Sequence, residues 1–89
     1  MDNVALLIKV KKGLGITGDY QDDTIQLYID EVKQYMLSAG VNQAIIDSSL
    51  SIGTIIRGVS DLWNYGSGTT ELSPYFKERC IQLREKRGE

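Results

Sequence analysis

The sequence predicts an all-α fold, a small compact bundle of about four helices with an exposed loop before the last helix. In several separate segments, apolar residues recur at the spacing of one helix face. Glycines or a serine–proline pair mark the boundaries of those segments. No stretch shows a convincing strand pattern. A chain of 89 residues with short links between helices is therefore expected to fold as one domain over residues 1–89.

The first helix is predicted from Asp2 to about Lys12. Asp2 can cap it, because its carboxylate can accept hydrogen bonds from the free backbone N–H groups of the first turn. Gly13 and Gly15 are expected to end it. One broad apolar face holds Leu6, Leu7, Val10 and Leu14. This face predicts that the helix packs against the core.

The second helix is predicted to start at Asp22 or Asp23, to run to about Ala39 and to stop at Gly40. Its core-facing stripe consists of Ile25, Tyr28, Ile29, Val32, Met36 and Ala39. Leu27 points almost opposite this stripe. An apolar residue in that position hints at a second contact surface.

Residues 41–46 are compatible with either a short turn of helix or an extended link. The polar residues at 47–49 are expected to cap a third helix over about 49–64. Its apolar stripe holds Ile52, Ile55, Ile56, Val59, Leu62 and Trp63. Gly53 and Gly58 lie inside this pattern, where a glycine either permits the close approach of another backbone or is a tolerated local weakness.

The last quarter of the chain combines a polar loop with a sharply started helix. The loop consists of Gly66, Ser67, Gly68, Thr69, Thr70, Glu71 and Leu72. Ser73 is expected to cap the fourth helix and Pro74 to occupy its first position, where the missing N–H costs nothing. Phe76, Cys80 and Leu83 share one face. Among the nearby aromatic residues, we expect Trp63 and Phe76 in the core and leave Tyr65 and Tyr75 open.

Composition argues against several classes of function. The chain has no histidine, which removes the commonest general base and metal ligand, and a net charge of −2 does not favour a large phosphate-binding surface. Its single cysteine fits a reducing compartment. There is no long apolar run and no signal peptide pattern, so we expect no membrane association and synthesis in the cytoplasm.

Three motifs that could carry chemistry have simpler interpretations. Asp19, Asp22 and Asp23 lack the remaining ligands of a calcium loop and fit helix capping better. The G-x-G-x-x-G pattern at 13–18 follows no strand, so it indicates a helix end and a turn. Cys80 has no histidine partner and shares an apolar face, which favours a buried thiol over a nucleophile. We therefore expect no enzyme activity, no catalytic residues, no metal and no cofactor.

The C-terminal helix and tail are basic, with Lys77, Arg79, Arg84, Lys86 and Arg87. Glu78 and Glu85 dilute these charges. A solvated helix face is the favoured interpretation, with protein contact and phosphate contact as the alternatives.

Three passages, in this order, resemble the phage head–tail connector (adaptor) family. They are the opening helix with its L-G-I ending at 6–16, the sequences DDTIQLYID and VKQYM within 22–36, and LSPYFKERCIQLR at 72–84. The resemblance covers nearly the whole chain, although each motif alone is loose. The chain departs from the family at Tyr35 and Met36, because many members have an alanine-rich second helix.

This resemblance implies a structural phage or prophage protein of the head–tail junction, made in the bacterial cytoplasm. Family members form a ring, with twelve-fold or similar symmetry expected, which joins the portal to tail-side completion proteins around a DNA channel without sequence-specific contacts. By similarity, the loop and the last helix are candidates for contact with neighbours or with the portal. With the off-stripe leucine, the candidate interface is Leu27, Gly66, Ser67, Gly68, Thr69, Thr70, Glu71, Leu72, Tyr75, Lys77, Arg79 and Arg84. The alternative is a small helical DNA-binding or regulatory protein that uses the basic C-terminal helix.

Overall fold

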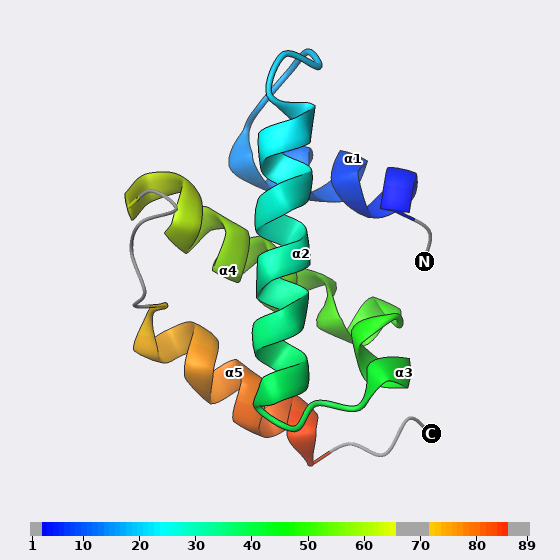
Figure 1. Cartoon of the computed structure of the whole chain (residues 1–89), viewed down its shortest axis with the longest axis vertical. Coiled ribbons are helices and arrows are strands. Elements are labelled where there is room, and N and C mark those ends of the chain that lie inside the picture. The colour runs from blue at the N-terminus through cyan, green and yellow to red at the C-terminus, as the bar shows by residue number, and fades with distance from the viewer. Residues whose placement is uncertain (1–2, 66–71, 86–89) are drawn as a thin grey trace.

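A computed structural model describes residues 3–65 and 72–85 (Figure 1). The elements in chain order are α1 (Asn3–Leu14), α2 (Asp22–Ser38), α3 (Gln43–Ile46), the 3-10 helix η1 (Ser49–Ser51), α4 (Ile52–Tyr65) and α5 (Pro74–Arg84). The described residues contain helices and connecting turns but no strand. The predicted all-α fold is confirmed.

Helix α2 runs along the longest axis of the molecule, and α4 crosses behind it (Figure 1). Helix α4 makes its most extensive contacts with α2 and with α1, and it also carries α5. Helices α1 and α5 thus lie towards opposite ends of α2, with α4 as the common support. This arrangement leaves the outer side of α2 and one side of both α1 and α5 without a covering element.

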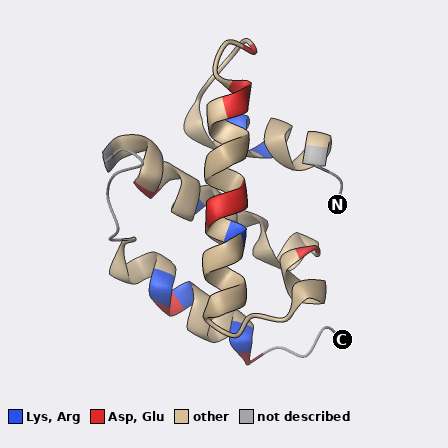
Figure 2. Ribbon diagram, viewed as in Figure 1, with Lys and Arg blue, Asp and Glu red and all other residues tan. Residues whose placement is uncertain are grey.

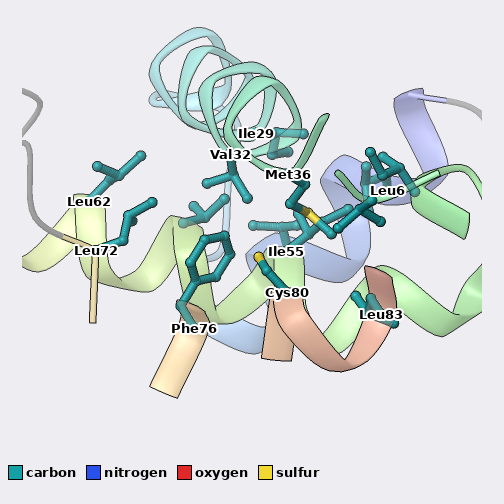
Figure 3. Close-up of a cluster of buried hydrophobic side chains, with 14 of the residues drawn as sticks. Leu6, Ile29, Val32, Met36, Ile55, Leu62, Leu72, Phe76, Cys80 and Leu83 are labelled. Carbon is teal, nitrogen blue, oxygen red and sulfur yellow. The ribbon is translucent and has the colours of Figure 1, made fainter. Parts of the chain in front are cut away.

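The core lies where α1, α2, α4 and α5 converge, and Figure 3 shows part of it. Its fully or nearly buried apolar residues are Leu6, Val10, Ile25, Ile29, Val32, Met36, Val41, Ile45, Ile46, Ile55, Val59, Leu62, Leu72, Phe76, Cys80 and Leu83. The predicted stripes supply most of this set. Their remaining members, such as Tyr28, Ile52 and Trp63, pack partly buried at its edge. Phe76 is fully buried, as expected from its place on α5.

Helix α1 ends later than predicted, at Leu14 instead of Lys12. Gly13 remains helical, and Ile56 of α4 occupies the space beside it, 2.7 Å from where a β-carbon would lie. Gly15 ends the helix with φ of 74°, a left-handed conformation that favours glycine. The predicted cap at Asp2 lies outside the described residues.

Helix α2 starts at Asp22, as predicted, but its N-cap is Gln21, whose side chain makes no capping hydrogen bond. Asp22 and Asp23 instead occupy the first turn, where the helix dipole favours carboxylates. Asp22 also forms an ion pair with Lys11 Nζ at 2.7 Å, which connects the end of α1 to the start of α2.

The ambiguous segment at 41–46 contains the short helix α3. Asn42 caps α3 by accepting a 2.7 Å hydrogen bond from the backbone N–H of Ala44. Ser48 then caps η1 through the N–H of Leu50. The predicted third helix therefore has two parts, a 3-10 turn followed by α4, and α4 extends one residue beyond the predicted end, to Tyr65.

The two glycines inside α4 have different roles. A β-carbon on Gly58 would lie 2.7 Å from the Phe76 ring and 2.9 Å from the Val32 methyl groups. A β-carbon on Gly53 would meet no atom within 4 Å. Gly58 is therefore the point of close approach of α2, α4 and α5, while Gly53 is only a local weakness of the helix.

We expect Gly58→Ala to destabilise the fold by about 1–3 kcal/mol, because the added methyl group overpacks the contact with Phe76. Gly53→Ala is the matched control and should stabilise by up to about 1 kcal/mol, since alanine is the better helix former. Urea unfolding of both variants measures the difference. Equal shifts of the two midpoints would contradict the packing role of Gly58.

Candidate protein-interaction site

A buried carboxylate connects α4 to the start of α5. Asp61 is almost fully buried on α4, and its Oδ2 accepts a 3.1 Å hydrogen bond from the backbone N–H of Ser73. Its Oδ1 lies 3.6 Å from Nε of Arg57, one helical turn earlier. Buried polar groups are stabilised when they have hydrogen-bond or ion-pair partners, and Asp61 has one of each. Asp61 therefore fixes the position of the backbone at Ser73, directly before α5.

Arg57 continues this connection to the surface. Its guanidinium carbon lies 5.1 Å from the centroid of the Tyr75 ring, within cation–π range. Tyr75 itself is 56% exposed at the start of α5. The Arg57 contact thus holds an exposed aromatic ring in place, which is typical of residues that anchor a protein partner.

The start of α5 is capped as predicted. The Ser73 hydroxyl accepts a 3.2 Å hydrogen bond from the N–H of Phe76, and Pro74 occupies the first turn. Leu72 differs from its expected role in a contact loop, because it is only 8% exposed and packs in the core near Leu62 (Figure 3). It anchors the end of the loop and offers no apolar side chain to a partner. Gly66, Ser67, Gly68, Thr69, Thr70 and Glu71 lie outside the described residues.

Of the cations predicted on the last helix, Arg79 and Arg84 are exposed and Lys77 is half-buried, and acidic residues lie next to them along the chain (Figure 2). Arg79 and Tyr75, with Glu78 and Gln82, line a shallow hollow of about 170 Å³ on one flank. Lys77 and Arg84 belong to the other flank, as their positions on the helix require. Lys86 and Arg87 lie outside the described part of the chain.

Leu27 occupies a separate surface. It is 63% exposed on the side of α2 opposite the buried stripe, as the sequence predicted. Leu27 and the α5 residues of the candidate interface therefore lie on two separate surfaces, since α5 packs against α4 and Leu27 faces outward from α2. Two exposed side chains on α1, Val4 and Ile8, were missed. Their spacing of four residues was the signal that could have found them.

Several chemical interpretations find no support in the geometry. Cys80 is buried, and this burial raises the pKa of its thiol to about 11, so it is a poor nucleophile at neutral pH. Within residues 3–65 and 72–85, no acidic, cysteine or histidine cluster could hold a metal ion. In the same residues, no helix is long and apolar enough to cross a membrane.

Comparison with known proteins gives the context for these surfaces. The family model of phage gp6-like head–tail connector proteins matches residues 4–83. The chain belongs to this connector family. The match spans every helix described above, from α1 to the end of the α5 core face at Leu83. Neither the comparison with curated proteins nor that with solved structures gave a match.

As a member of this family, the protein is a structural phage protein that joins head and tail. It confirms the resemblance that the three sequence passages indicated. The family is a structural one and not a known family of enzymes, which agrees with the interpretation of Cys80 as a packing residue.

We expect Asp61→Ala to destabilise the connector by about 1–3 kcal/mol, because the substitution leaves the Ser73 N–H without its acceptor. Asp30→Ala is the matched control, since Asp30 is exposed on α2, where it accepts a 3.0 Å hydrogen bond from the Gln26 side chain. Its effect should stay within about 0.5 kcal/mol. Urea unfolding midpoints provide the comparison, and similar losses in both variants would contradict the anchoring role of Asp61.

The Cys80 thiol should make stability depend on pH in the alkaline range. Its pKa is raised from 9.0 to about 11 in the folded state, so the folded protein holds the thiol proton more tightly than the unfolded chain does. The contribution is fully present below about pH 9 and is lost as the pH rises towards 11, by about 2–3 kcal/mol.

Cys80→Ala removes this titration. The difference in unfolding free energy between the wild type and this variant should therefore shrink as the pH rises through that window. A difference that stays constant from pH about 8 to about 11 would contradict the shifted pKa.

Proposed function

We propose that copies of this connector assemble into a closed ring that joins the portal of the capsid to tail-side completion proteins. DNA passes through the ring without sequence-specific contacts. The observation that carries the proposal is the match to the head–tail connector family over residues 4–83. The ring is expected to have twelve-fold or similar symmetry.

The surface of the subunit supports this assembly. A ring requires two different faces on each copy, because the contact between neighbours is heterologous. The described residues carry exposed apolar side chains on two different faces, Val4 and Ile8 on α1 and Leu27 on α2. A domain of this size has a narrow stability margin, which assembly would widen.

The α4–α5 junction and the loop before it are proposed to contact the portal or another head–tail protein. The chain is fixed on both sides of residues 66–71. Helix α4 ends directly before them, and after them Leu72 is buried and the Ser73 N–H donates to Asp61. Residues Tyr75, Lys77, Arg79 and Arg84 follow directly on α5.

Native mass spectrometry with negative-stain imaging, on the pure connector and on the connector mixed with portal protein, tests the proposal. Closed rings of one defined size are expected in at least one of the two samples. A monomer in both samples would overturn the ring. A stable dimer that shifts duplex DNA, with binding that weakens steeply with salt, would favour the DNA-binding alternative instead.

Deletion of residues 66–70 tests the portal-contact assignment separately. We expect the variant to retain the helicity of the wild type and to lose attachment to the portal, because the deletion removes the proposed contact loop. Circular dichroism and co-sedimentation with portal rings measure the two properties. Attachment at wild-type affinity would show that the loop is not the contact.

A further inference from the structure

The outward side of α1 carries an apolar row with basic residues beside it. Val4, Ile8 and Lys12 follow one another at intervals of four residues, so they form one row about 12 Å long on the helix. Val4 is 69% and Ile8 49% exposed. Lys9 is exposed next to the row. Among the described residues neither Lys9 nor Lys12 has an ion-pair partner, whereas Lys11 is paired with Asp22.

The outward side of α2 has the same layout with the opposite charge. Asp23, Leu27 and Glu31 form a row at intervals of four residues, and Asp30 lies beside it. Leu27 is well exposed at the centre, and all three carboxylates are exposed. The front of α2 in Figure 2 carries acidic residues near its upper end and at its middle.

The two helices differ in charge as a whole. Helix α1 contains three lysines and no carboxylate, whereas α2 contains four carboxylates and one lysine. Each row is therefore repelled by a copy of itself and attracted by the other row. This pattern disfavours a symmetric dimer through either helix and favours a contact between unlike faces.

The rows also lie on different faces of one subunit. Helix α1 buries Leu6 and Val10 against the core, and α2 buries Ile29 and Val32. Both rows point away from those buried residues, so one copy cannot join its own two rows. Contact between unlike faces of successive copies produces a ring when the rotation closes.

We propose that the α1 row of one connector subunit packs against the α2 row of the next. Val4 and Ile8 meet the neighbour's Leu27, and Lys9 and Lys12 lie against its carboxylates. The proposal rests on the ring of the proposed function and identifies the surfaces between its copies. It leaves the α4–α5 junction free for a different protein of the head–tail junction.

The cations of α5 fit the α2 row less well. Arg79 donates to Gln82 at 3.4 Å, and Arg84 forms an ion pair with Glu85 at 3.8 Å. Glu78 adds a further negative charge to that helix face. The lysines of α1 have no such acidic neighbours on their own helix, so they carry the stronger attraction.

Charge reversal and mixing test this pairing. The first variant carries Lys9→Glu and Lys12→Glu, and the second carries Asp30→Lys and Glu31→Lys. Each alone has two faces of the same sign, so we expect its subunit association to weaken at least about tenfold. An equimolar mixture restores one attractive pair at every contact, so rings should reappear with alternating copies. Native mass spectrometry reads both the ring size and the composition.

A matched variant with Asp19→Lys and Asp47→Lys reverses the same number of charges at exposed carboxylates outside both rows and outside the α4–α5 junction, and it should assemble like the wild type. The pairing would be overturned if the α1 and α2 variants both still formed rings of wild-type size, or if rings failed to reappear on mixing. Neither result would contradict the ring itself. Loss of rings in this matched variant as well would also overturn the pairing, by showing that any reversal of two surface charges prevents assembly. A wild type that forms no ring, alone or on portal protein, would instead remove the proposed function on which the pairing rests.

Discussion

The structure depends on one close approach, where Phe76 of α5 and Val32 of α2 meet the backbone of α4 at Gly58. No side chain larger than hydrogen fits there without displacing a ring or a methyl group. Through this contact α5 becomes part of the same core as α2 and α4, and the Tyr35 ring packs 5.5 Å from that of Phe76. Cys80 and Leu83 extend this core contact along α5.

The polar contacts at the start of α5 determine which of its side chains are exposed. Asp61 holds the backbone at Ser73, and Arg57 lies between Asp61 and the exposed Tyr75 ring. The packing of Phe76 at Gly58 and these polar contacts both fix the first turn of α5. Together they restrict its rotation, so that Phe76, Cys80 and Leu83 face inward and Arg79 faces out. A surface held in this way loses little conformational freedom on binding, which is an advantage for a structural connector.

Helices α1 and α2 also have one side in the core and one side exposed. Each of α1 and α2 uses one side for the core and leaves an apolar residue among like charges on the other. Under the proposed pairing of α1 with α2, this layout disfavours contact between like faces of two copies and favours contact between unlike faces. Under that pairing, charge decides which apolar surfaces of successive copies meet.

The sequence by itself determined the helical class, the stripes that form the core, the capped start of α5 and the outward position of Leu27, because these follow from local periodicity and capping chemistry. It also contained the three passages that resemble the connector family. Only the tertiary structure decided that Leu72 is buried, that Gly58 is a packing point while Gly53 is not, and that Asp61 reaches Ser73 twelve residues away. These properties depend on which helices cross and at what distance, and no local pattern encodes the neighbour that a residue will meet.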